Sequence, residues 1–218
     1  MLKAIKSIYL IGSCARNEEC VHSSYMDLLI FSCIDVPGKA MFMASPGAKI
    51  IVLPLPTNGL VVDPITCNLS KVYTIRLSRE PKKLIYGSPI KFKDINIESL
   101  NPKDYEDYAF NLALRIRASK RVNIPRYTCK VLYELLWFIL LTEQKEAIGY
   151  TFTNILNNIR KSPVHAEYVD VIEYCYDVLK CSIEGYKWLS RVTSTLNSIY
   201  SRYLSRYLGN ELRVMLKL

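Results

Sequence analysis

The chain of 218 residues lacks several patterns that mark large classes of proteins. Its seven cysteines form no C-x-x-C pair and it has only two histidines, which argues against a zinc site. Such cysteines favour reduced thiols in a cytoplasmic protein. The longest uncharged apolar run near the middle, residues 135–142, is far shorter than the roughly 20 residues that span a membrane. We therefore expect no membrane partner.

Negative charge is also scarce in this chain. It has 20 acidic residues against 29 Lys and Arg, which gives a net charge of +9. Half of the residues are hydrophobic, so the chain has enough apolar surface to form a folded core. The excess of positive charge favours a phosphate-bearing partner, either a nucleotide or a nucleic acid. The single glutamine, Gln144, fits the composition of thermophilic proteins.

The composition and the hydrophobic pattern of the sequence change near residue 100. Most glycines and prolines lie in the first half, between short apolar segments that predict strands at 7–12, 27–33, 39–44, 49–55 and 71–77. Helices are predicted to begin at Asn101-Pro102 and at Pro125, and to follow at about 148–161, 164–182 and 184–208. The second of these is apolar around most of its circumference and should be a central, buried helix. The sequence thus predicts an α+β fold, with a small mixed sheet and flanking helices over 1–100 and a helical bundle over 101–218.

One segment, residues 8–31, carries a pattern with chemical meaning. It is predicted to form a strand, a Gly-Ser turn, a short helix from Ser13, a polar loop and a strand that opens with Asp27. A Gly-Ser turn at a helix start offers backbone N–H groups and a hydroxyl to an anion. A carboxylate on the adjacent strand offers a ligand to a divalent cation. Each piece taken alone is also a common structural feature, a helix cap or a solvated acid.

The order and spacing of these residues resemble the signature of polymerase-beta-like nucleotidyltransferases. In that family a strand ends in Gly-Ser, Ala-Arg follows, and a Ser-Asp-x-Asp-Leu strand comes about a dozen residues later. The matching positions here are Gly12, Ser13, Ala15, Arg16, Glu18, Ser24, Asp27, Leu28, Leu29 and Ile30. Asp63-Pro64 and residues 83–87 are similar to the closing part of the catalytic unit in aminoglycoside nucleotidyltransferases, in which a helical bundle follows.

The resemblance implies an activity and roles for particular residues. It implies magnesium-dependent transfer of a nucleoside monophosphate from an NTP to a hydroxyl, with Asp27 as the catalytic residue. The implied metal ligand is Asp27, with Asp63 as a substitute for a further ligand, and the implied phosphate-binding residues are Gly12, Ser13 and Arg16. Arg117 and Arg121, from the basic stretch described below, are the other candidate phosphate-binding residues.

The chain departs from the family pattern at two positions. The first carboxylate of the family's Asp-x-Asp pair is replaced by Tyr25, and the strand at 49–55, where a third is expected, contains no acid. Two functions therefore stay open. One is an active nucleotidyltransferase, and the other is a catalytically inactive scaffold of the same fold that binds a nucleotide or a nucleic acid. The acceptor, the nucleotide and the presence of a homodimer are not decided by the sequence.

Two further patterns lie in the second half. Residues 109–133 contain no acid and six bases, namely Arg115, Arg117, Lys120, Arg121, Arg126 and Lys130. They predict either a surface for phosphates or a solvated helix end. Arg160 and His165 resemble the Arg-x4-His ribonuclease motif of helical toxins, but Ser162-Pro163 predicts a helix break between them. A surface histidine near a helix start is therefore the favoured interpretation of His165.

Overall fold

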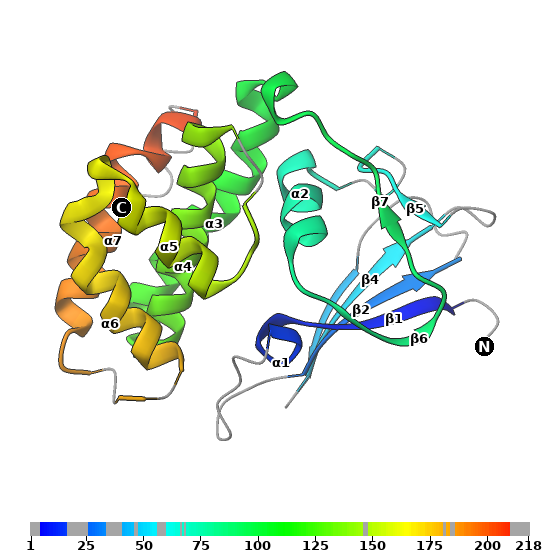
Figure 1. The fold of residues 1–218 in the computed structure, drawn as a ribbon, viewed down its shortest axis with the longest axis horizontal. Coiled ribbons are helices and arrows are strands. Elements are labelled where there is room, and N and C mark those ends of the chain that lie inside the picture. The colour runs from blue at the N-terminus through cyan, green and yellow to red at the C-terminus, as the bar shows by residue number, and fades with distance from the viewer. Residues whose placement is uncertain are drawn as a thin grey trace. The chain divides into compact units, whose positions relative to one another are not determined.

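The computed structural model describes residues 5–16, 26–33, 41–45, 48–55, 60–65, 67, 69–145, 148–180, 182–183 and 186–209. The chain divides into two compact units, residues 1–95 and 96–218, which we call the sheet unit and the helical unit and describe separately (Figure 1). This division lies a few residues before the boundary predicted at 100. The predicted α+β fold class, a mixed sheet followed by helices, is confirmed.

The sheet unit is built on a five-stranded mixed sheet with the order β3-β4-β2-β1-β6. Its strands are β1 (Ile5–Ile11), β2 (Met26–Ser32), β3 (Met41–Ser45), β4 (Ala48–Pro54) and β6 (Lys83–Gly87). β2 and β4 are parallel and the other neighbours are antiparallel. Two short strands, β5 (Val61–Val62) and β7 (Lys91–Phe92), form a separate parallel pair. The first four predicted strands are confirmed within a few residues.

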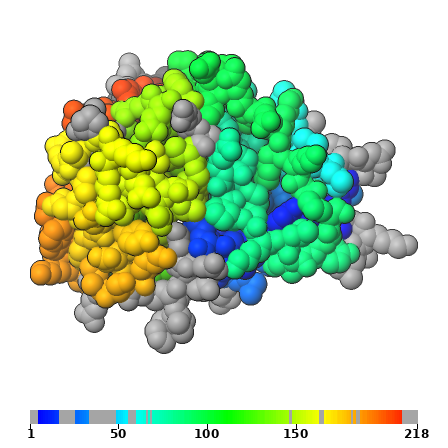
Figure 2. Space-filling model, viewed as in Figure 1, coloured from blue at the N-terminus to red at the C-terminus, as the bar shows by residue number. Residues whose placement is uncertain are grey.

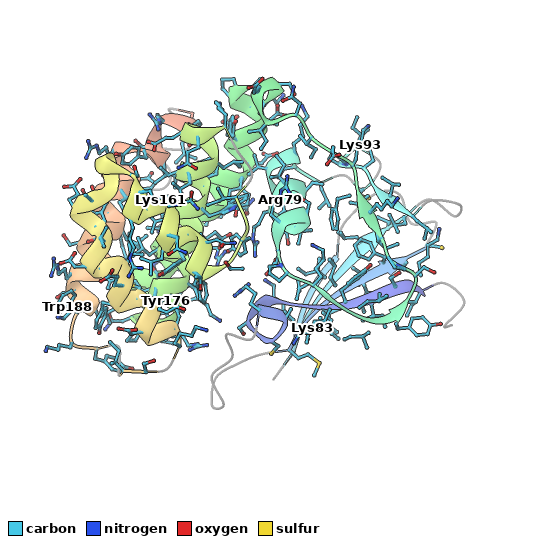
Figure 3. All side chains as sticks on the ribbon, viewed as in Figure 1. Arg79, Lys83, Lys93, Lys161, Tyr176 and Trp188 are labelled. Atoms are coloured by element: carbon cyan, nitrogen blue, oxygen red, sulfur yellow. The ribbon has the colours of Figure 1, made fainter. Side chains whose placement is uncertain are left out.

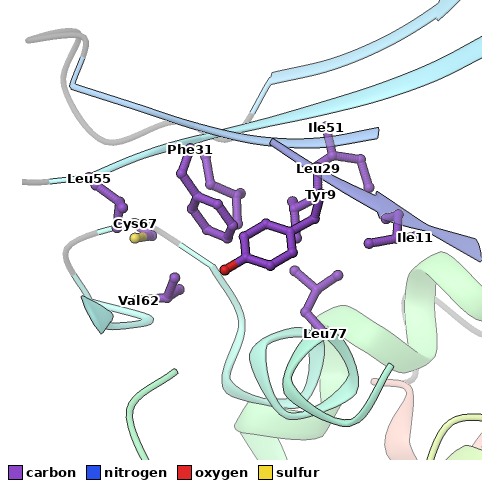
Figure 4. Close-up of a cluster of buried hydrophobic side chains, with 10 residues drawn as sticks. Tyr9, Ile11, Leu29, Phe31, Ile51, Leu55, Val62, Cys67 and Leu77 are labelled. Atoms are coloured by element: carbon purple, nitrogen blue, oxygen red, sulfur yellow. The ribbon is translucent and has the colours of Figure 1, made fainter. Parts of the chain in front are cut away.

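Alternate residues of the central strands bury their side chains on one face of the sheet. Side chains two apart in a strand point to the same face. The resulting cluster contains Tyr9, Ile11, Leu29, Phe31, Ile51, Leu53, Leu55, Val62, Cys67 and Leu77 (Figure 4). Asp27 lies two residues before Leu29, so it belongs to the same face. The carboxylate of Asp27, the second residue of β2, therefore lies at the edge of this apolar cluster.

The strand predicted at 71–77 is wrong, because this segment forms the helix α2 (Lys71–Arg79). Its sequence, KVYTIRL, alternates like a strand but also repeats apolar residues at helical spacing. Ser70 decides between the two, since its Oγ accepts a hydrogen bond from the backbone N–H of Tyr73 and so caps the helix. Val72 and Ile75, three residues apart, are then both buried.

The helical unit consists of α3 (Pro102–Val122), α4 (Pro125–Gln144), α5 (Phe152–Lys161), α6 (Val169–Leu179) and α7 (Leu189–Arg202), with 3-10 turns at Ile97–Ser99, Pro163–Tyr168 and Leu204–Tyr207. The predicted starts at Asn101-Pro102 and Pro125 are confirmed. Asn101 and Asp104 cap α3 reciprocally through a capping box. Among the described residues, no helix is both long and apolar enough to cross a membrane.

α4 is the central helix of this unit, as its composition predicts. Every residue from 131 to 142 is buried. The Oη of Tyr133 donates a hydrogen bond of 3.1 Å to the carbonyl of Ile172, and Nη1 of Arg126 donates one of 2.7 Å to the carbonyl of Leu179. The residue numbers rise along α4 as they fall along α6, so the two helices are antiparallel. The start of α4 therefore lies at the end of α6.

Candidate functional site

Gly12 and Asp27, the centre of the predicted site, are brought together by β1 and β2. Asp27 is the cross-strand partner of Ile11, and Gly12 follows as the first residue of the short helix α1 (Gly12–Arg16). A Cβ placed on Gly12 would lie 2.3 Å from Oδ2 of Asp27, and the φ of Gly12 is +73°. Both observations require glycine here, because any side chain would collide with the carboxylate and strain the backbone. Ser13, the next residue, is buried.

A third residue, Glu80, makes polar contacts with this site from the end of α2. Its Oε1 accepts a hydrogen bond of 3.2 Å from the backbone N–H of Gly12 and one of 3.0 Å from Nη1 of Arg16. Nη2 of Arg76 lies 3.6 Å from the other oxygen, Oε2. The side chains of Arg16 and Glu80 are only 6% and 2% exposed. Two of the donors predicted to hold a triphosphate are therefore directed at a carboxylate of the protein itself.

The end of α2 places Glu80 in this position. Glu80 is the C-cap of α2, and its backbone N–H donates to the carbonyl of Arg76, so the two side chains lie one turn apart. Pro81 follows and cannot continue the helix. Lys82 turns back, and its Nζ donates hydrogen bonds to the carbonyls of Leu77 and Glu80. Burial lowers the pKa of Lys82 to about 8, partly opposed by the charge of Glu80.

A lysine lies beside Asp27 on the neighbouring strand. β4 runs parallel to β2, and Lys49 is the residue of β4 in register with Asp27. Lys49 lies two residues before Ile51, so it is on the same face of the sheet as Asp27. This is the strand on which the family would carry its third carboxylate. Asp27 thus has a cationic neighbour at the point where a second acid would help to bind a metal.

Asp63, the other predicted metal ligand, lies near the opposite end of β4. Its carbonyl accepts a hydrogen bond from the N–H of Cys67, whose Sγ contacts the carbonyl of Pro54. Five residues of strand, about 17 Å, separate Pro54 from Lys49, the partner of Asp27. The carboxylate of Asp63 pairs instead with Nζ of Lys93 at 2.6 Å. The structure does not bring the two predicted ligands to one metal site.

The residues that the structure describes at this site fit a pair of magnesium ions poorly. Two-metal catalysis needs several carboxylates around both ions. In the part of the chain that the structure describes, no three His, Cys, Asp or Glu residues are grouped to hold a metal. Tyr25, Ser24 and Glu18, which belong to the predicted motif, lie outside the described residues. We therefore derive no step through a metal ion.

The predicted basic cluster of the helical unit is divided between two roles. Arg115 forms an ion pair with the buried Glu134, which also accepts a hydrogen bond of 3.0 Å from the Oη of Tyr108. Arg126 binds the carbonyls at the end of α6. These arginines stabilise the bundle. Three others, Arg117, Lys120 and Arg121, lie together on the last turns of α3, at positions where their side chains reach solvent.

Arg160, one of the two residues that resemble the ribonuclease motif, forms an ion pair with Glu173. Its Nε and Nη2 donate hydrogen bonds of 3.0 and 2.6 Å to Oε1 of Glu173. α5 and α6, yellow to gold in Figure 2, lie side by side here and form a groove of about 340 Å³. The groove is lined by Thr153, Leu156, Asn157, Arg160, Glu173, Tyr176 and Asp177. The predicted helix break is confirmed, because α5 ends at Lys161 and His165 belongs to a 3-10 turn.

Sequence reasoning missed Glu80, the centre of the buried ion cluster. One local signal exists, since Arg76 and Glu80 are four residues apart, a spacing that pairs side chains on a helix. A strand prediction for the segment hides this signal, because side chains four apart in a strand do not meet. The contacts to Gly12 and Arg16 join positions more than sixty residues apart and have no local signature.

The comparisons with known proteins add no family to these observations. No protein-family model matches the chain, and no curated protein matches it. A function for this chain must therefore be argued from its own residues.

Proposed function

We propose that this chain is a catalytically inactive, nucleotidyltransferase-like scaffold that binds nucleic acid by positive charge. The observation that carries the proposal is the register of β2 and β4, which sets Lys49 beside Asp27. A magnesium pair needs negative charge concentrated around it, and a lysine at this position lowers the affinity for a cation. The chain has the Gly-Ser turn and the strand of the motif, but it lacks the cluster of carboxylates that would bind the metal ions for transfer.

The buried Glu80 supports the same conclusion. A triphosphate that entered the site would meet Gly12 and Arg16, whose N–H groups already donate to Glu80. Displacing this carboxylate would leave it buried without its hydrogen bonds, which costs several kcal/mol, of the order of 3–5. An incoming phosphate would also be repelled by the charge of Glu80. The N–H groups of Gly12 and Arg16 therefore hold the end of α2 against α1 through Glu80.

Accessible positive charge is also present on the helical unit. The net charge of +9 attracts polyanions over a distance of about one Debye length, roughly 8–10 Å at moderate salt. On α3, Arg117, Lys120 and Arg121 lie within about one turn of one another, so they offer several charges to one backbone. A nucleic acid is the anion that carries phosphates in such a row.

The proposal is tested by binding and transfer assays on the full chain. A fluorescent oligonucleotide should bind equally well with magnesium and with EDTA, and its affinity should fall steeply with salt. No label should move from radioactive ATP or CTP to any acceptor of a test panel. Binding that needs magnesium, or that does not change between low and high salt, would contradict the proposal.

A second candidate function is favoured by one observation, the close approach of Asp27 to Gly12. This contact places a carboxylate directly against the Gly-Ser turn, as transfer of a nucleoside monophosphate would require. If this function is correct, label transfer with magnesium is found for some acceptor and is lost in Asp27→Ala. The matched control is Asp94→Ala, since Asp94 is an exposed acid of the same unit and should retain transfer. Transfer unchanged in Asp27→Ala would exclude it.

A further inference from the structure

One end of the helical unit collects positive charge from three helices. α3 ends at Val122 and two residues connect it to α4, and the start of α4 lies at the end of α6, as the bond from Arg126 to the carbonyl of Leu179 fixes. We define the basic end as residues 117–130 and 176–180. Its charged residues are the bases Arg117, Lys120, Arg121, Arg126, Lys130 and Lys180 and a single acid, Asp177. Basic residues that lie far apart in the sequence are thus brought together at this end of the helical unit.

The charges of the basic end differ in their accessibility. Arg126 is held by the carbonyls of α6, and burial lowers its pKa. Arg117, Lys120 and Arg121 are partly or fully exposed on α3. Lys180 lies over the ring of Tyr176, with its Nζ 5.7 Å from the ring centre (Tyr176 is labelled in Figure 3). Besides Arg126, five cations of this end are therefore partly or fully exposed: Arg117, Lys120 and Arg121 on α3, Lys130 on α4 and Lys180 at the end of α6.

Apolar side chains are exposed among these cations. Val122 is 50% exposed and Ile124 is 47% exposed, and both follow closely after Arg121 at the turn between α3 and α4. A nucleic-acid duplex presents phosphates and groove edges, and its base faces are stacked inside. A single strand presents base faces, which pack on apolar and aromatic side chains while cations bind the backbone. Alternating charge and apolar surface therefore fits a single strand better than a duplex.

We propose that the basic end is a binding site for single-stranded nucleic acid. Arg117, Lys120 and Arg121 bind its phosphates, and bases pack on Val122 and Ile124. This inference rests on the proposed function for the class of ligand and adds the site and the form of the nucleic acid. It is independent of the sheet unit, whose Gly-Ser turn has no part in it.

The first experiment measures affinity for a labelled single-stranded oligonucleotide by fluorescence anisotropy. The double variant Arg117→Glu/Arg121→Glu should weaken binding by at least about tenfold and reduce the salt slope by about 1.4, roughly 0.7 for each phosphate of a single strand that is no longer bound. The control is Lys103→Glu, one charge reversal of the same kind on the same helix, with half the total charge change of the double variant. Lys103 lies fourteen residues before Arg117, about 21 Å along α3, and this variant should change the affinity little.

The second experiment separates base packing from charge. Val122→Ser/Ile124→Ser removes no charge and alters exposed side chains, so folding should be unchanged in thermal melts. It should weaken single-strand binding by about tenfold and leave binding of a duplex of the same length unaffected. The wild-type chain should prefer the single strand.

Each outcome decides a different question. If no oligonucleotide binds at any salt concentration, the proposed function fails. If oligonucleotides bind but the arginine and apolar variants bind as the wild type does, or if duplex and single strand bind equally, this inference fails and the proposed function remains. Tighter binding to vesicles of anionic lipid or to an acidic peptide than to the oligonucleotide would overturn the inference as well.

Discussion

The two units differ in whether their ion pairs are buried or lie at the surface. In the sheet unit, Glu80 is enclosed by Arg16, Arg76 and the backbone of Gly12, so the charges bind one another inside. In the helical unit, most acids of α6 and of the turn before it pair with arginines at the surface, as Glu173 does with Arg160. Buried ions fix an architecture because they tolerate no loss of a partner. Surface ions can change partners, and the proposed binding of a polyanion by the helical unit depends on this property.

Glu134 in the helical unit, like the exposed pair of Asp63 and Lys93 in the sheet unit, departs from this contrast. It is buried in the helical unit, but its partner Arg115 is about one third exposed and the Oη of Tyr108 provides a neutral donor. A ligand or solvent can therefore compensate part of this pair. Glu80 has no comparable access, since the side chains of both its arginines are mostly buried.

The largest effect is expected for Glu80→Gln. The change removes the buried negative charge to which Arg16 and Arg76 both bind, which should lower the free energy of unfolding by about 3–5 kcal/mol. Urea denaturation of the full chain measures it. Glu98→Gln, which alters an exposed acid, is the control and should change stability by less than about 0.5 kcal/mol. A similar small change for Glu80→Gln would mean that the cluster does not hold the unit together.

Gly12→Ala should be the next most destabilising. The positive φ costs about 1–2 kcal/mol for a residue with a Cβ, and overlap with Asp27 adds about 1–3 kcal/mol. Because the overlap is with one side chain, Asp27→Ala should recover that part in the double variant. A double-mutant cycle of denaturation measures the coupling. If the two changes are simply additive, the carboxylate does not pack against Gly12.

Lys82→Met tests the buried charge by its pH dependence. Lys82 has a pKa of about 8 in the folded chain against an ordinary value of 10.5, so between these values the unfolded chain holds more protons. The stability of the wild type relative to Lys82→Met should therefore rise with pH above about 8, by up to about 1.4 kcal/mol per pH unit, and be constant below it. Lys91→Met, at an exposed lysine of the same unit, is the control variant. A constant difference from pH 7 to 9.5 (about the accessible range) would refute the lowered pKa.

The smallest effect is expected for Glu173→Gln at the surface. Its two hydrogen bonds with Arg160 are solvated, so the change should cost less than about 1 kcal/mol. The cost should disappear in concentrated sodium chloride, where the charges are screened. Thermal melts at two salt concentrations measure it. A loss as large as that of Glu80→Gln would remove the contrast between the two units.

The sequence predicts much of the fold because local signals agree with the tertiary structure. Asn101-Pro102 and Pro125 start helices, and the apolar circumference of 125–143 forms the central helix. The prediction for 71–77 fails because its apolar spacing suits both helix and strand, and only the cap at Ser70 separates the two. The 3-10 turn at Pro163–Tyr168 likewise shortens a helix that periodicity alone extends.

The candidate site is predicted less completely than the fold. The contact between Gly12 and Asp27 follows from the order of strand, turn and strand. The hydrogen bond between Arg16 and Glu80 does not follow from the local sequence. The two residues are 64 positions apart, and only the packing of α2 brings them together. The basic end is similar, since α6 adds Lys180 to a cluster that the sequence locates only on 109–133.

The distance along the chain between Arg16 and Glu80 has a consequence for the order of folding. Contacts between distant residues form slowly, because a long loop must close before they stabilise anything. The pair cannot form during synthesis until the 64 residues that follow Arg16 have been made. The hairpin of α3 and α4, with its two-residue connection, needs no such delay. We therefore expect the hairpin to form rapidly and the sheet unit to close late, with Arg16 charged and solvated in the interval.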